Sequence, residues 1–219
     1  MFLDEYGSLL VSATLETLYM TGMTVALGYL LGLPLGIFLY ITDKESISEN
    51  KVVNAIVGWF ANMLRSIPFM ILLIALMPFT RLIVGKAIGP TAAIVPLVIG
   101  SAPFIARMVE TSLNEIDRGL IDCSRAMGAT NFQIITRVLM PETLPSLIRG
   151  MSIATITIIG YTALAGAVGG GGLGDVAFRY GFHRYETGVM WVTVLILVIM
   201  VQVIQVAFDL WAKRIDKNV

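Results

Sequence analysis

Apolar residues run along this chain in long blocks that polar residues rarely interrupt. A helix needs about 20 mostly apolar residues to cross the hydrocarbon core of a bilayer. Five blocks meet that length, and they occupy residues 9–41, 52–79, 91–109, 146–168 and 189–211. The pattern predicts an all-α integral membrane protein with five transmembrane helices, folded as a single domain over residues 1–219.

The first two blocks are longer than a single crossing requires. We therefore expect each of them to include an interfacial turn or a stretch that lies in the membrane plane. Glu16 and Arg65 fall in these blocks, and a charge at the bilayer centre costs about 2.5–3.5 kcal/mol. Either charge costs less free energy near an interface or facing the interior of the bundle.

Composition supports the membrane assignment. Hydrophobic residues make up 57% of the chain and charged residues 14%, whereas a soluble domain carries about 25% charge. The net charge of zero gives no information on partners, but the positions of the charges predict orientation. With the N-terminus outside and the C-terminus inside, the outer loops contain only Arg81, Lys86, Arg179 and Arg184, as the positive-inside rule requires.

Residues 115–141 form a polar, basic insert between the third and fourth blocks. Ile116, Leu120, Cys123 and Met127 recur at helical spacing, which predicts a short amphipathic helix with these side chains on one face. A helix pair of this kind has little purpose unless something docks on it. The insert therefore indicates a membrane subunit that a separate partner drives.

The ends of the two helices in this insert are marked by local signals. Gly128 is the residue type that commonly ends a helix in the left-handed conformation, and Thr130 followed by Gln133 is a capping box that begins the next one. We expect Pro141 to end this second helix before the fourth span begins. A plain connecting loop would need none of these signals.

Glycines and prolines interrupt several spans, for example at Gly32, Pro34 and Gly36, at Pro68, and at Pro103. Breaks at membrane depth are tolerated where neighbours or water in a cavity satisfy the freed carbonyl groups. Kinks around a central path are one interpretation. Ordinary helix packing is the other, because both residue types are common in membrane helices.

The insert resembles the cytoplasmic signature of ABC importer permeases. That signature reads Glu-Ala-Ala, three residues, Gly, nine residues and Ile-x-Leu-Pro; its positions are filled here by Asp122, Cys123, Ser124, Gly128, Val138, Met140 and Pro141. The spacing matches throughout, and Gly128 and Pro141 are retained. The other positions keep the size and character of the family's residues.

Further stretches resemble the methionine branch of these permeases. They are L-R-S-I-P-F-M-I-L-L from Leu64, I-V-P-L-V-I-G-S-A-P-F-I-A-R-M-V-E from Ile94, S-R-A-M-G-A-T from Ser124 and G-A-V-G-G-G-G-L-G from Gly166. The run T-L-E-T-L-Y-M-T from Thr14 is similar to the start of the core in small permeases more generally. The likeness covers nearly the whole chain, and it alone suggests methionine.

The resemblance implies a type I importer permease fold in the inner (cytoplasmic) membrane, with the insert as a coupling helix. It implies that two copies of a separate ATPase bind ATP and Mg, that a periplasmic or lipid-anchored binding protein delivers the substrate, and that a second copy of this chain completes the path. The residues that would contact the ATPase are Asp122, Cys123, Ser124, Arg125, Ala126, Met127, Gly128, Ala129 and Thr130.

Polar groups within apolar spans are candidates for the translocation path. Tyr161 is the strongest, and the others are Thr162, Ser101, Ser66 and Asn62. Met108, Leu164 and Met190 are candidates for apolar gates, because flexible side chains adapt to a passing molecule. Each of these residues also has a plain interpretation as helix packing.

Other chemistries find little support in the residues. Gly85-Lys86 lacks the flanking residues of a phosphate-binding loop, so we expect ATP hydrolysis on another polypeptide and no enzymatic activity here. One histidine, His183, and one cysteine, Cys123, predict no metal site. The basic residues follow membrane topology, which argues against a nucleic-acid partner.

Two alternatives to methionine import remain open. The first is an importer for another small amino acid, such as cystine. The second is a membrane scaffold or sensor component that transports nothing.

Overall fold

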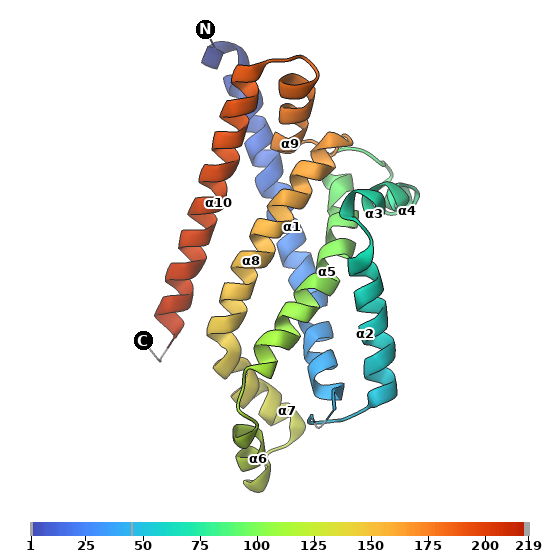
Figure 1. Cartoon of the computed structure of the whole chain (residues 1–219), viewed down its shortest axis with the longest axis vertical. Coiled ribbons are helices and arrows are strands. Elements are labelled where there is room, and N and C mark those ends of the chain that lie inside the picture. The colour runs from blue at the N-terminus through green and yellow to red at the C-terminus, as the bar shows by residue number, and fades with distance from the viewer. Residues whose placement is uncertain (1, 45, 217–219) are drawn as a thin grey trace.

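The computed structural model describes residues 2–44 and 46–216, and the described part consists of helices and the loops that join them (Figure 1). The membrane core is made by the longer helices, while shorter ones form the two ends of the molecule. The elements in chain order are α1 (Phe2–Thr42), α2 (Lys51–Ser66), α3 (Phe69–Ala75), α4 (Met77–Val84), α5 (Pro90–Asn114), α6 (Arg118–Ala126), α7 (Asn131–Ile134), the π-helical turn η1 (Ile135–Leu139), α8 (Met140–Ala167), α9 (Gly172–Val176), the π-helical turn η2 (Ala177–Phe182) and α10 (Thr187–Ile215).

Five membrane crossings agree with the lengths and compositions of these helices. Within the described residues, four helical stretches are long and apolar enough to cross a bilayer alone. The bent pair α2 and α3 passes the same test together, which makes five if the pair is one broken crossing. Helix α5 packs against both α1 and α8, while α10 packs on α8 and α2 on α5 (Figure 1). The predicted all-α membrane fold is confirmed.

Of the two long apolar blocks, one is broken and the other is a continuous helix. The second is broken, as predicted: α2 ends at Ser66, Ile67 is extended, and α3 then runs at 97° to α2. The break falls there because Pro68 disfavours helical geometry in the residue before it. For the first block the expected turn or in-plane stretch is wrong, because α1 is one continuous helix that contains Pro34.

Glycines on α1 let that helix pack closely against α5. Gly28, Gly32 and Gly36 recur every four residues and so share one face. A Cβ at Gly32 would lie 2.8 Å from the Ala102 carbonyl oxygen, and one at Gly36 would overlap the Ala106 carbonyl oxygen. Small residues let two membrane helices approach closely. In this part of the chain, packing is the correct interpretation of the glycines.

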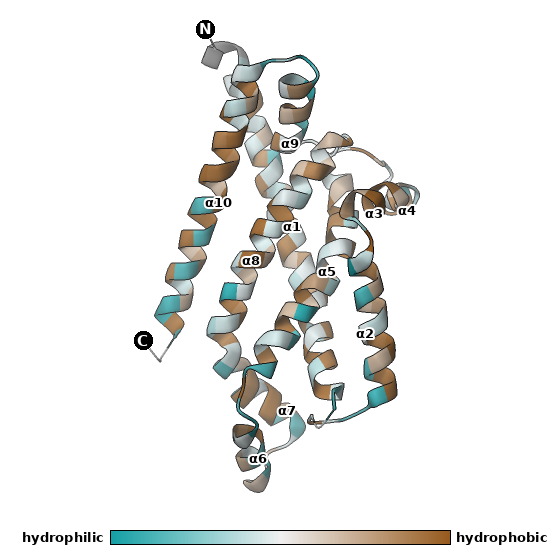
Figure 2. Ribbon diagram, in the orientation of Figure 1, coloured by the Kyte–Doolittle hydropathy of each residue, from teal (hydrophilic) through white to brown (hydrophobic). Residues whose placement is uncertain are grey.

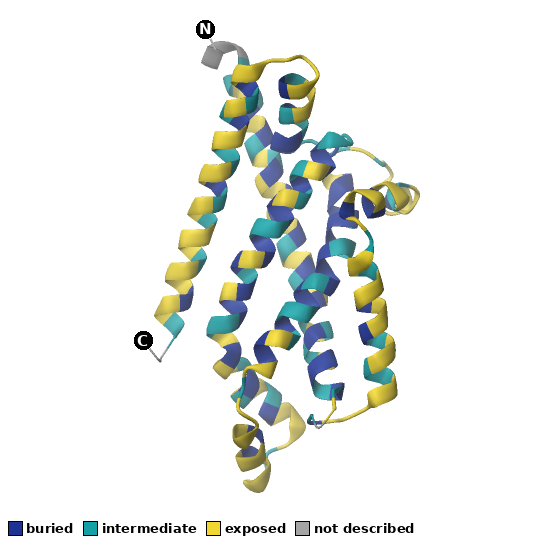
Figure 3. Ribbon diagram, in the orientation of Figure 1, coloured by how far each residue is buried: buried dark blue, intermediate teal, exposed yellow. Residues whose placement is uncertain are grey.

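Apolar side chains on the outside of the bundle suit a lipid environment. Figure 2 shows apolar residues along α10, and Figure 3 shows that much of this helix is exposed. Its exposed side chains include Leu195, Ile199 and Val203. A surface of this kind would be expelled from water, so α10 contacts either lipid or another membrane helix.

The outer end of the bundle is closed by the short helix α9. The Glu16 carboxylate accepts a hydrogen bond from the Gly172 N–H at 2.7 Å, and the Thr17 hydroxyl accepts one from the Leu173 N–H at 2.9 Å. Glu16 thus faces the bundle and accepts a hydrogen bond from the N-terminus of α9. This is one of the two placements that the sequence predicted for its charge. A Cβ at Gly174 would overlap the backbone of Ala163, so this glycine-rich stretch is a tightly packed turn.

Candidate functional site

The insert between the third and fourth spans forms the helix pair that its end signals predict. Helix α6 begins at Asp117, whose carboxylate accepts the Gly119 N–H at 2.7 Å. The helix is followed by Gly128 at φ +81°. Thr130 and Gln133 then form a complete capping box that starts α7. The local sequence was sufficient to predict this helix pair, because each signal acts within four residues.

The packing face of α6 differs from the predicted one. Ile121 and Ser124 are buried against the rest of the chain, whereas Leu120, Cys123 and Met127 point outward. Met127 is 81% exposed, and Phe132 just beyond the turn is 74% exposed. Three of the four apolar residues assigned to one face are therefore available to another molecule, whereas Ile116 packs against the core. Asp122, Ala126 and Thr130 are exposed beside them, while Ala129 is half-buried.

Arg125 ties this segment to the first span. Its guanidinium Nη2 donates to the Ile47 carbonyl oxygen in the α1–α2 loop at 2.9 Å. A cavity of ≈ 200 Å³ separates the loop from α6, and Lys44, Arg118 and Asp122 also line it. Because Arg125 reaches back to the protein, it positions α6 as well as lying on its surface.

The second helix of the insert continues into the fourth span, so the predicted stop at Pro141 is wrong. Residues Asn131–Ala167 form one continuous helical stretch. The Met140 N–H bonds the Ile135 carbonyl five residues back, which makes the π-helical turn η1. A proline lacks an N–H and clashes with the carbonyl four residues before it. The wider turn accommodates both effects and keeps the helix intact.

Buried residues join the insert to the membrane helices. Ile121 of α6, Ile134 of α7 and Leu139 of η1 belong to one apolar cluster with Ile105 and Leu113 of α5. The interior of a protein is close-packed and transmits displacement. The buried face of α6 is therefore in direct contact with the inner end of the bundle.

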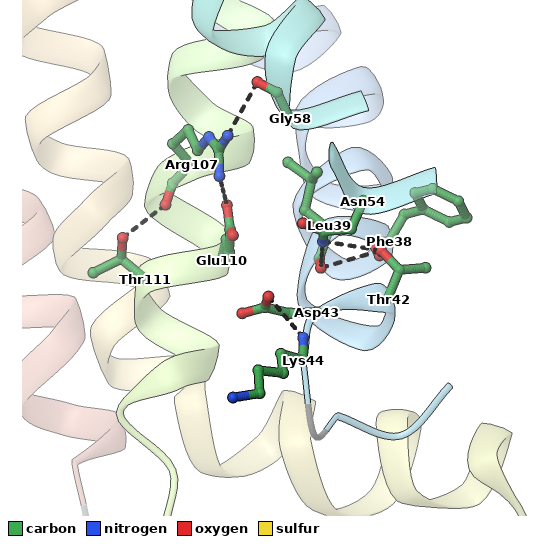
Figure 4. Close-up of polar contacts among 10 residues, drawn as sticks. All are labelled: Phe38, Leu39, Thr42, Asp43, Lys44, Asn54, Gly58, Arg107, Glu110 and Thr111. Atoms are coloured by element: carbon green, nitrogen blue, oxygen red, sulfur yellow. Dashed lines mark hydrogen bonds and ion pairs between the residues drawn. The ribbon is translucent and has the colours of Figure 1, made fainter. Parts of the chain in front are cut away.

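Polar contacts attach α2 to the same inner end (Figure 4). The Arg107 Nη2 donates to the Gly58 carbonyl at 3.1 Å, and Nη1 pairs with Glu110 at 2.7 Å. The Asn54 amide donates to the Leu39 carbonyl at 2.7 Å and to the Thr42 hydroxyl at 3.1 Å. Helices α1, α2 and α5 are consequently held together on the side where the insert lies.

A charged cavity opens on one side of the bundle. It has a volume of ≈ 440 Å³ and is lined by residues of α2, α5 and α8 and by Glu115 just beyond α5, with Arg65, Arg107, Arg149 and Glu115 among them. Glu115 accepts a hydrogen bond from the Ser146 hydroxyl at 2.8 Å. Charged groups that face the hydrocarbon of a membrane carry a large free-energy cost. The open side therefore faces water or another protein chain.

Two predicted path residues lie against cavities, but not the same one. Met108 lines the charged cavity. Tyr161 lines a neighbouring cavity of ≈ 240 Å³, where its ring stacks on Phe69 with centroids 4.4 Å apart. Arg65 and Phe104 line both cavities, which therefore lie side by side.

The other predicted path residues are dispersed. Ser101 and Thr162 are 0% and 1% exposed and hydrogen-bond to carbonyls of their own helices. Asn62 and Ser66 are exposed on α2 outside both cavities, and Ser66 donates to the Asn62 carbonyl. Leu164 is also exposed, and Met190 packs close to Gly181 at the outer end of α10.

Sequence reasoning did not assign roles to Phe69, Phe104 or Arg65. The charge of Arg65 within an apolar block was the available signal. No sequence signal distinguishes these two aromatic residues from other apolar positions. Among the described residues no group of His, Cys, Asp or Glu could hold a metal ion.

A comparison with known protein families identifies the family of this chain. Residues 32–219 match the model of the binding-protein-dependent transport system inner membrane component. The chain belongs to this family. As an inner membrane component of an ABC transporter it is a permease subunit rather than an enzyme, and its predicted location in the inner membrane is confirmed.

Individual relatives cover nearly the whole of this inner membrane component. It is 50% identical over 96% of its length to the "Probable D-methionine transport system permease protein MetI" of Vibrio cholerae, of which 93% is covered. It is 45% identical over 94% of its length to the "Methionine import system permease protein MetP" of Bacillus subtilis, again with 93% covered.

A solved structure has the same fold. The permease chain in a structure titled "Inward facing conformations of the MetNI methionine ABC transporter" superposes with a TM-score of 0.96 at 48% identity, over 98% of this chain and 99% of that one. The predicted type I importer permease fold is thereby confirmed.

Proposed function

We propose that this permease carries methionine inward across the inner membrane, driven by ATP hydrolysis on a separate subunit. The observation that carries the proposal is the 50% identity over 96% of the chain to a permease named for D-methionine. The fold match to the MetNI methionine transporter agrees with it. Both lines concern the whole chain rather than a local motif.

The proposed assembly contains two copies of this chain and two copies of the ATPase, with ATP and Mg bound only by the latter. The charged cavity supports the second copy, because its open side carries Arg65, Arg107 and Arg149 and needs a protein or aqueous neighbour. The exposed apolar face of α6 supports the ATPase as the partner on the inner side. A binding protein would deliver methionine at the outer end, near α9.

The proposed mechanism is alternating access. ATP binding closes the ATPase dimer and brings its two docked α6 helices together. The apolar cluster that contains Ile121, Ile134 and Leu139 passes this displacement to α5 and α8. The Arg107 and Asn54 contacts carry α2 along, so that the bundle rearranges as a unit and the cavity changes the side on which it opens.

Uptake into proteoliposomes tests the proposal and its alternatives together. The permease is reconstituted with its ATPase and binding protein, and ATP-dependent accumulation of radiolabelled L-methionine is measured with unlabelled D-methionine or L-cystine as competitor. We expect the accumulation to require ATP. Unlabelled D-methionine should reduce it more strongly than L-cystine does. Dominant competition by cystine would assign the other cargo, and absence of any ATP-dependent uptake would favour a scaffold.

A further inference from the structure

Arg65 occupies an unusual position at the break in the second span. It lies in the last turn of α2, directly before the extended residue Ile67 and Pro68. Its guanidinium lines both the 440 Å³ cavity and the 240 Å³ cavity. The guanidinium carbon lies 5.9 Å from the centre of the Phe104 ring, within cation–π range. Arg65 is therefore positioned to contact a molecule in either cavity.

The arginines of the larger cavity differ in their partners. Arg107 pairs with Glu110, and Arg149 pairs with Asp216, both at 2.7 Å. In the part of the chain that the structure describes, no carboxylate pairs with Arg65. Arg65 is therefore the cavity arginine whose fork of donors is free to bind an anion.

Arg65 is exposed on the surface of this chain, beside the membrane-spanning helix α5. Its neighbour Phe104 lies within α5, 14 residues from Pro90 and 10 residues from Asn114. At 1.5 Å per residue these separations are about 21 Å and about 15 Å. An unpaired charge within a membrane bundle is costly, so a bound anion or water in the cavity must solvate it.

Apolar and aromatic residues line the smaller cavity together with Arg65, and polar atoms make up more of its exposed wall than apolar atoms do. Phe69 and Tyr161 stack there, and Leu72 lies beside them. Gly100 leaves the space open, because a Cβ at that position would lie 3.3 Å from the Phe69 ring and 3.2 Å from Leu72. Aromatic walls favour an apolar or thioether side chain.

We infer that Arg65 binds the carboxylate of the transported amino acid inside the permease, while Phe69, Phe104 and Tyr161 contact its apolar side chain. The inference rests on the proposed function and adds to it a substrate site within this chain, separate from that of the binding protein. The site discriminates for a free carboxylate joined to an apolar or thioether side chain.

Equilibrium binding to the purified permease–ATPase complex, without binding protein, tests this site. The probe is radiolabelled L-methionine, and the competitors are norleucine, which keeps the carboxylate, and methioninol, which lacks it. We expect norleucine to displace the probe and methioninol to displace it poorly. Arg65→Gln should weaken binding at least about tenfold, the loss expected when a charge-assisted hydrogen bond is removed.

Two variants control for charge and folding. Arg214→Gln makes the same change at an exposed arginine of α10 that lines neither cavity, and it should leave binding unchanged. Arg65→Lys keeps the charge and should bind within a few-fold of the wild type. ATPase rate and gel filtration report on assembly of each complex.

Three results would overturn the inference: Arg65→Gln binding like the wild type, methioninol competing as well as norleucine, or a wild-type complex that transports methionine yet binds none without the binding protein. The last result would leave the proposed function intact. A wild-type complex without ATP-dependent uptake would instead remove the proposed function itself.

Discussion

Gly128→Val is expected to reduce ATP-driven uptake and transport-linked ATPase stimulation at least tenfold while the protein still inserts into the membrane. Gly128 has φ +81°, and a Cβ there would meet nothing within 4 Å. The substitution therefore causes no clash inside the chain. It places a branched residue in the left-handed region, at a cost of about 1–2 kcal/mol, and puts a new side chain between α6 and α7 on the proposed docking surface.

Gly85→Val is the matched control for this prediction. Gly85 also has φ +81° and open space around a Cβ, but it ends α4 at the outer end of the bundle. The two substitutions carry the same backbone strain, so only the position relative to the ATPase differs. Equal transport by the two variants, measured in the same proteoliposomes, would remove the coupling role from the Gly128 turn.

Gly36→Ala is expected to destabilise the permease itself. Its Cβ would overlap the Ala106 carbonyl oxygen and lie 2.6 Å from the Val109 Cβ. Neither neighbour is the far end of a flexible side chain, so α1 and α5 must separate. Overpacking of this kind costs about 1–3 kcal/mol or more. The expected result is a lower melting temperature in detergent and a reduced yield of assembled complex.

Gly22→Ala provides the comparison on the same helix. A Cβ at Gly22 would meet nothing within 4 Å, and alanine has the better helix propensity. Its melting temperature should equal or exceed that of the wild type. If Gly36→Ala and Gly22→Ala melted alike, the close approach of α1 and α5 would not be a source of stability.

The features that sequence could predict are those set by nearby residues. The five apolar blocks, the Pro68 break, the Gly128 turn and the Thr130 capping box each depend on a few consecutive positions. Signals of this kind can be read from the sequence without knowledge of the tertiary packing. This is why the arrangement of spans and the helix pair between them were predictable.

The features that sequence missed depend on packing between distant segments. Helical spacing groups Leu120, Cys123 and Met127, but it does not tell that Ile121 and Ser124 face the bundle instead. A proline predicts a helix end, but the π-helical turn before Pro141 absorbs it. Polar character alone selected Ser101 and Thr162, although both lie in packed interiors.

We propose that this permease meets its ATPase at the exposed face of α6. The single cysteine of the chain allows a test of this contact without any mutation. Cys123 lies on that face and is exposed. A photoactivatable maleimide reagent attached to Cys123 is irradiated in the assembled complex, and maleimide reactivity is compared between the complex and the free permease. We predict a cross-link to the ATPase subunit and reduced reactivity of Cys123 in the complex. Equal reactivity in both states, with no cross-link to the ATPase, would contradict the account.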